Sequence, residues 1–204
     1  MAITKDYFYS NIMIPYTGNS NLDAPLDEAI LRYEQEILKS LLGYTLWKEY
    51  TTGIAEVTPD QKWKDLRDGA EFSFELNGYT IETKWEGFEN ARKISLVAYY
   101  IYYQYRKYGE TQFTGTGEKS QVSENSTDAD FQNKMIWIQN EMVRLYGVTP
   151  NYLIRRGIGQ YFRNLDNYVH YNDEPSAFNF LLANKDTYTS WVFSPIRKDT
   201  YLGF

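Results

Sequence analysis

Few residues of this chain have side chains suited to catalysis. His170, in the stretch NYVHYNDE, is the one histidine, and there is no cysteine. A histidine-based triad needs a nucleophile and a carboxylate at the same place, and nothing near His170 resembles a nucleophile elbow. The stretch GTGEKS, residues 115–120, lacks the glycine spacing and the adjacent Gly-Lys-Ser of a phosphate-binding loop. We therefore expect no triad, no thiol chemistry and no nucleotide site.

The 27 Asp and Glu residues are the remaining groups that could perform acid–base or metal chemistry. Glu34 with Glu36, and Asp65 with Asp68, show no shared apolar setting that would separate their pKa values. They are interpreted as solvated helix faces. Asp128, Asp130 and the Asn-Asp-Glu run at 172–174 do not match the spacing of a calcium loop. The sequence predicts a protein that is not an enzyme, with no cofactor and no metal; a hydrolase or nuclease would require convergent carboxylates.

Composition favours an assembly role over nucleic-acid binding. The 204 residues carry a net charge of −6, whereas a free-standing nucleic-acid binder needs an excess of Lys and Arg. The 20 Tyr, 11 Phe and 5 Trp residues suit surfaces that are exposed to water in one state and covered by a partner in another. A Tyr-rich core would have a similar composition. No signal peptide and no run of about 20 apolar residues is visible, so we expect no membrane contact.

Hydrophobic periodicity predicts a mainly α fold: a bundle of about four to five helices with an inserted β-hairpin and an extended C-terminal arm. An N-terminal extended segment, 1–25, precedes a helical domain at 26–147. The predicted helices lie at 26–43 with a stop at Gly43, 44–53, 58–69, 88–108 and 128–147, and 109–128 is predicted to be a long loop.

The hairpin is predicted at 71–84, where apolar residues alternate on both sides of Asn77-Gly78. Asn-Gly supplies the positive φ angles of a type I′ turn. Because an isolated two-stranded hairpin is marginal in water, it must pack on the bundle or on a partner. The expected contact residues are Phe72, Phe74, Leu76 and Ile81.

The stretch ISLVAYYIYYQYRKYGE, from Ile94, could be a membrane segment, a stacking surface for nucleic acid or a packed helix. Charged and polar residues interrupt it, which argues against a membrane. About 20 residues without a turn signal indicate a helix that is apolar on most of its circumference, hence a central one.

Residues 148–204 hold many aromatic side chains without sustained periodicity. This composition is too aromatic for disorder and predicts an extended arm whose side chains enter separate pockets on a partner. The expected partner-binding residues of the arm are Arg155, Arg156, Tyr188, Trp191 and Phe193. Arginine could pair with phosphate or with an acidic protein surface, and the acidic chain favours the protein partner.

Several stretches together resemble head-tail connector, or head completion, proteins of tailed bacteriophages. The pattern comprises LLGYTLW, KWKDLRDG, the Asn-Gly hairpin, and WEGFENARKISLVAYYIYYQYRKYG, followed by a polar loop and one more helix. It covers roughly residues 25–147 and is most similar to the version in crAss-like and other phages of Bacteroides-type hosts. The C-terminal stretch AFNFLLANKDTYTSWVF is also reminiscent of that group.

This resemblance implies a helical protein assembled as a homo-oligomeric ring, usually of twelve copies, beneath the portal protein. In such a ring we expect Tyr100 and Tyr103 to present hydroxyl-bearing rings to a neighbouring subunit. Such a ring extends the channel through which genomic DNA passes without specific binding, and it offers a surface to tail or other ring proteins. The location implied is the virion, after synthesis in the host cytoplasm. A different function remains open: a peripheral tail or fibre adaptor that binds virion or host proteins outside the channel.

Overall fold

The computed structural model describes residues 3–14, 18, 20–76, 79–109, 111–114, 117–120, 131–147 and 176–194. Within these ranges the fold is mainly α, and the predicted fold class, a bundle of four to five helices with an inserted hairpin, is confirmed. The helices are α1 (Ser20–Ile54), α2 (Gln61–Asp68), α3 (Leu96–Gly109), α4 (Phe131–Tyr146) and α6 (Ala177–Ala183). The strands are β1 (Ala70–Leu76), β2 (Tyr79–Trp85), β3 (Thr111–Thr114) and β4 (Gly117–Ser120).

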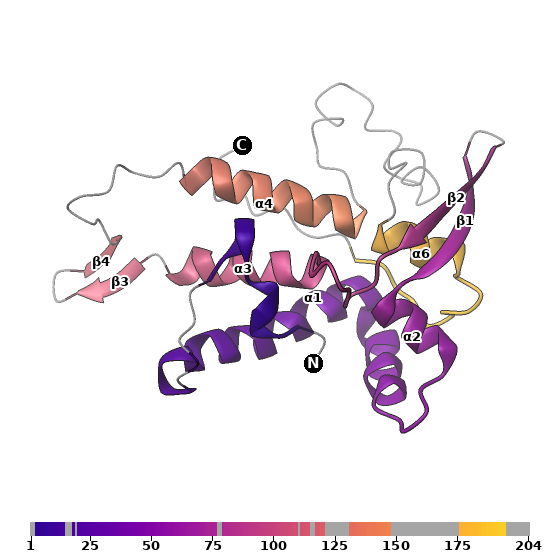
Figure 1. Ribbon diagram of the computed structural model, residues 1–204, viewed down its shortest axis with the longest axis horizontal. Coiled ribbons are helices and arrows are strands. Elements are labelled where there is room, and N and C mark those ends of the chain that lie inside the picture. The colour runs from indigo at the N-terminus through magenta and orange to yellow at the C-terminus, as the bar shows by residue number, and fades with distance from the viewer. Residues whose placement is uncertain are drawn as a thin grey trace.

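Helix α3 lies between α1 and α4 and forms the centre of the bundle (Figure 1). Every residue from Leu96 to Tyr103 is buried. The ring of Tyr100 meets Tyr33 of α1 at 6.4 Å between centroids, and Tyr99 meets Trp137 of α4 at 6.0 Å. The Tyr-rich stretch is therefore a core helix, as predicted. No helix in the described part is long and apolar enough to cross a membrane.

Helix α1 bends sharply at Gly43, which has φ 75° and ψ 158° inside an otherwise helical run. The sequence predicted a helix stop at this glycine, and the structure continues the chain in a second helical half at a new angle. A bend removes main-chain hydrogen bonds at the end of the first half. Here the indole of Trp191 donates to the Leu41 carbonyl oxygen (2.9 Å), and the Val192 N–H donates to that of Leu42 (3.4 Å).

Residues 176–194 pack against the helical domain, so the prediction that they belong to an extended arm is wrong. The hydroxyl of Tyr188, whose side chain is 2% exposed, donates to the Lys62 carbonyl oxygen at 2.7 Å. Phe193 packs on Phe178 and Tyr146. These aromatic residues show no single helical or strand periodicity, because they pack between several different elements. The remainder of the predicted arm lies outside the described residues.

Three further stretches differ from the prediction. The helix expected at 88–108 begins only at Leu96, as α3. The N-terminal segment is not a plain extension: it contains 3₁₀-helices at Lys5–Tyr7 and Ser10–Ile12, and α1 begins at Ser20. Its buried side chains join the same core, namely Ile3, Tyr7, Phe8, Ile12 and Ile14. The predicted loop at 109–128 contains the short antiparallel pair β3–β4. The last two stretches are too short for periodicity to identify them.

The main hairpin has the predicted antiparallel pairing, with Phe74 opposite Ile81 and Leu76 opposite Tyr79. It projects from the helical body beside α6 (Figure 1). At its base, the Phe72 ring meets Phe180 at 5.5 Å, and Phe74 is buried. The bundle itself thus covers these two predicted contact residues, whereas the side chains of Leu76 and Ile81 and the Asn77-Gly78 turn lie outside the described residues.

Deleting residues 176–204 should destabilise the whole helical domain rather than release it intact. The deletion removes four large buried side chains, Phe178, Phe180, Leu181 and Tyr188, each contributing about 1.5–3 kcal/mol. That sum is comparable with the entire stability of a typical domain, about 5–15 kcal/mol. We expect loss of the cooperative melting transition in circular dichroism. The matched control deletes only 195–204, which keeps every contact described above. If the chain lacking 176–204 melted cooperatively at the same temperature as the chain lacking 195–204, residues 176–194 would not be part of the core.

Candidate functional site

Two stretches of the connector-like pattern, KWKDLRDG and WEGF, meet in the structure at a close crossing of backbones. Gly69 ends α2 with φ 95°, and Gly87 follows β2 with φ 83°. A Cβ atom on Gly87 would lie 2.3 Å from the Arg67 carbonyl oxygen, and one on Gly69 would lie 2.2 Å from that of Trp85. Both positions thus require glycine for space as well as for conformation. We call this contact the Gly69–Gly87 crossing.

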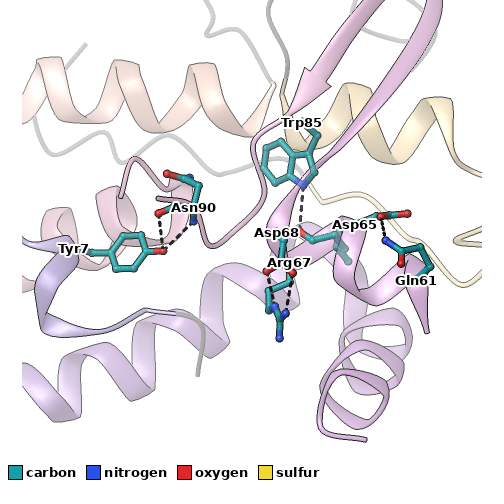
Figure 2. A network of polar contacts seen from close by, with 8 residues as sticks. Tyr7, Gln61, Asp65, Arg67, Asp68, Trp85 and Asn90 are labelled. Atoms are coloured by element: carbon teal, nitrogen blue, oxygen red, sulfur yellow. Dashed lines mark hydrogen bonds and ion pairs between the residues drawn. The ribbon is translucent and has the colours of Figure 1, made fainter. Parts of the chain in front are cut away.

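Polar contacts fix the same junction from both sides (Figure 2). The indole of Trp85 donates to the Leu66 carbonyl oxygen at 3.1 Å, and the Glu89 N–H donates to that of Arg67 at 2.8 Å. Further along the loop, the Tyr7 hydroxyl accepts from the Asn90 N–H at 3.0 Å. The N-terminal segment, α2 and the 86–95 loop are therefore tied into one unit next to the bend of α1.

A pocket of about 410 Å³ opens beside this junction, between the two halves of α1. We call it the elbow pocket. Its lining comes from both halves of α1, from the end of α2 and from the loop after β2: Leu31, Glu34, Gln35, Leu38, Trp47, Tyr50, Thr51, Ile54, Ala55, Arg67 and Glu89. The walls are aliphatic and aromatic, and three charged side chains converge on them. This combination is typical of binding pockets in proteins.

The elbow pocket is lined by charged groups of both signs, namely Glu34, Glu89 and Arg67. Glu34 is only 8% exposed and accepts a hydrogen bond from the Ile3 N–H at 3.2 Å. Burial raises the pKa of the Glu89 carboxyl above its usual range, and Arg67 offsets that effect only in part. Arg67 itself makes a two-pronged ion pair with Asp68, with Nε–Oδ1 at 2.7 Å and a second N–O contact at 2.8 Å. Arg67 also acts on Glu89, whose pKa its charge lowers.

The aromatic side of the pocket already attracts a cation. The Lys39 ammonium lies 4.2 Å from the ring centroid of Trp47. Tyr50 is buried, and its pKa is raised by that burial and, to a smaller extent, by the charges of Glu89 and Glu34. Carboxylates combined with aromatic faces bind positively charged groups, through ion pairs and cation–π contacts. In the described part of the chain no three His, Asp or Glu side chains are grouped to hold a metal ion.

The structure places the predicted partner-binding residues differently from the expectation. Tyr100 is 8% exposed and donates from its hydroxyl to Glu36 at 2.6 Å, and Tyr103 is also buried. Both tyrosines thus pack inside their own chain, because α3 is covered on two sides. Tyr188, Trp191 and Phe193 likewise pack on the helical domain, as described above.

Other sequence-based site assignments have mixed outcomes. Arg155, Arg156 and His170 lie outside the described residues. The interpretation of Glu34 as part of a solvated face is wrong, because its side chain is buried under the N-terminal segment. The elbow pocket was not predicted from sequence. The one sequence signal for it was Gly43, which marked the bend but not the residues that face each other across it.

Comparison with protein-family models found no match, and neither did comparison with curated proteins or with solved structures. The resemblance to connector proteins therefore rests on the sequence pattern alone. The Gly69–Gly87 crossing gives part of that pattern a physical reason, because it explains the glycines of KWKDLRDG and WEGF within this fold.

Replacing Gly87 by Ala should destabilise the protein by roughly 2–4 kcal/mol, through the positive φ and through contact with the Arg67 carbonyl. Gly18 is a matched control: its φ is +75° and its Cβ would meet nothing within 4 Å. Gly18→Ala should cost only about 1–2 kcal/mol. Urea unfolding measures both values. Equal losses of stability in the two variants would show that the close backbone approach at Gly87 does not contribute to the cost of the substitution.

The Glu89→Gln variant should be more stable than the original chain at pH 7. The raised pKa means that burial opposes the charged carboxylate, so this group lowers stability as pH rises through its folded-state pKa. Below the unfolded value of about 4.5 the carboxyl is protonated in both states and the difference should vanish. Urea unfolding at pH 7 and at about pH 4 measures the difference, with exposed Glu28→Gln as control. A variant that is less stable at pH 7 would indicate that Glu89 is well satisfied as an anion.

Proposed function

We propose that this chain is a structural virion protein of a tailed bacteriophage that forms a ring below the portal at the head–tail junction. The ring extends the DNA channel and offers a docking surface to tail components. The chain performs no catalytic step in this role. The proposal combines the connector-like pattern over residues 25–147 with the shape and charge of the folded domain.

The observation that carries the proposal is the hairpin that stands out from the helical body (Figure 1). Its base is fixed by Trp85, which is fully buried, and by the ring of Phe72 against Phe180. Its exposed residues include three carboxylates, Glu71, Glu75 and Glu82, and one cation, Lys84. A firmly anchored projection suits contact with a neighbouring subunit in a ring.

The negative charge supports the same role. Lysine and arginine on a channel wall would bind the phosphates of passing DNA and release counterions, which would hold the genome in place. An acidic surface avoids that binding. The chain carries a net charge of −6, and the exposed charged residues of its projecting hairpin are also negative on balance.

The peripheral adaptor remains the second candidate, because a projecting hairpin and an acidic surface would also serve binding outside the channel. The two functions differ in their partners. A connector must form a closed ring and bind the portal protein, whereas an adaptor binds a fibre or host protein and has no need of the portal.

Mass photometry of the full chain, alone and with its cognate portal protein, tests the proposal. We expect a discrete ring-sized multimer bound to portal, because a ring closes through one repeated contact between different patches. An unrelated acidic protein of similar size serves as the control for nonspecific binding to the portal protein. A chain that stays monomeric and does not bind portal would overturn the connector function and favour the adaptor.

A further inference from the structure

The outer edge of strand β2 has no neighbouring strand in the described part of the chain, where the main sheet consists of β1 and β2 alone. The hairpin that they form stands out from the helical body beside α6 (Figure 1). An edge of this kind presents a row of main-chain N–H and C=O groups that can pair with a strand of another molecule. It is therefore a surface to which a partner strand can be added.

The register of the hairpin shows which residues of β2 direct their main-chain groups at this edge. The pair Leu76–Tyr79 flanks a two-residue connection, and such a pair is hydrogen-bonded in a tight hairpin. Hydrogen-bonded and non-hydrogen-bonded pairs alternate along an antiparallel ladder. Thr80, Glu82 and Lys84 therefore belong to non-hydrogen-bonded pairs, so their N–H and C=O groups point away from β1.

The edge of β2 also carries two side chains of opposite charge, Glu82 and Lys84. Both are exposed, and in the described part of the chain neither side chain makes an ion pair. Within the hairpin, Glu82 lies opposite Ser73 and Lys84 lies opposite Glu71. The corresponding positions of β1, which are Glu71, Ser73 and Glu75, include no cation. A carboxylate and a cation two residues apart are thus present on the edge of β2 but not on that of β1.

Two copies of β2 in antiparallel orientation complement each other in one register. When Thr83 lies opposite Thr83 of the second copy, Glu82 of each copy lies opposite Lys84 of the other. Both members of each charged pair direct their main-chain groups at the partner, so the hydrogen bonds of the ladder form as well. The adjacent registers place Glu82 opposite Glu82, or Lys84 opposite Lys84, and like charges directly opposite are destabilising.

We propose that the free chain forms a two-fold dimer in which β2 pairs with β2 of a second copy, in the register centred on Thr83. Lys84 then lies between Glu71 of its own hairpin and Glu82 of the second copy. A two-fold contact closes after two copies, whereas a ring repeats a contact between two different patches. The dimer therefore goes beyond the proposed function: it is a form of the free chain that occupies the hairpin edge until assembly of the ring separates the copies.

Charge reversal on the full chain tests the contact, with the dissociation constant of the dimer measured by sedimentation equilibrium. Glu82→Lys opposes two pairs of like charges and should weaken the dimer at least about tenfold. Adding Glu71→Lys and Lys84→Glu to that chain reverses every charge of the contact, and should return the constant to within about threefold of the original. Glu28→Lys, the same charge change at an exposed position of α1, should change it less than about threefold. Circular dichroism melting confirms that each variant folds.

A single introduced cysteine reports the register, because the chain contains none. In the proposed dimer the two Thr83 residues form a non-hydrogen-bonded pair with Cα atoms about 4.5 Å apart, which a disulfide can span. Thr83→Cys should therefore give disulfide-linked dimers on a non-reducing gel when glutathione disulfide is the oxidant. Thr80→Cys on the same strand is the control, because its two thiols would lie roughly 20 Å apart along the strands.

Three results would overturn the inference: a free chain that is monomeric throughout the measured concentration range, equal effects of Glu82→Lys and Glu28→Lys, or no more cross-linking at Thr83→Cys than at Thr80→Cys. Open-ended assemblies in place of dimers would also overturn it, because they would indicate pairing of β2 with β1 of the next copy. The proposed function is tested separately. A chain that is monomeric when free but forms rings on portal refutes the dimer alone, whereas a hairpin dimer that never binds portal refutes the ring alone.

Discussion

The Gly69–Gly87 crossing is the constraint on which much of this structure depends. Two backbone segments pass so closely that neither position has space for a Cβ atom, and both adopt positive φ. The crossing sets the direction in which the hairpin leaves α2. It also positions Trp85 and Phe88, whose rings lie 5.6 Å apart. Trp85 donates to the Leu66 carbonyl oxygen of α2, and Phe88 meets Tyr50 in the second half of α1. The hairpin can project from the body because its base is held this firmly.

The bend of α1 depends on a second long-range contact. A helix that bends leaves carbonyl groups without their usual partners, and buried unpaired carbonyls are costly. Trp191 and Val192 donate to the carbonyls of Leu41 and Leu42, next to Gly43. The C-terminal stretch at 176–194 therefore stabilises the bend, and the bend creates the elbow pocket. A segment distant in sequence thus supports the candidate site without lining it.

The partly buried carboxylate of Glu89 has a structural cost. A carboxylate desolvated by burial destabilises the folded state at neutral pH unless a cation compensates it. Glu89 is in that position, and Arg67 compensates its charge only in part. Perturbed groups of this kind concentrate at functional sites, although structural ion networks also produce them.

The sequence by itself determined the local elements, because their signals are local. Helical spacing identified the core helix around Tyr100, Asn-Gly placed the hairpin, and Gly43 marked the break in α1. Only the tertiary structure decided which side chains are covered. Tyr100 and Tyr188 are buried in their own chain although their amphipathic rings suggested a partner, and Glu34 lies beneath the N-terminal segment. Burial depends on elements far apart in the chain meeting in space. Periodicity within one segment carries no information about what covers that segment, so neither the elbow pocket nor the packing of residues 176–194 could be predicted from it.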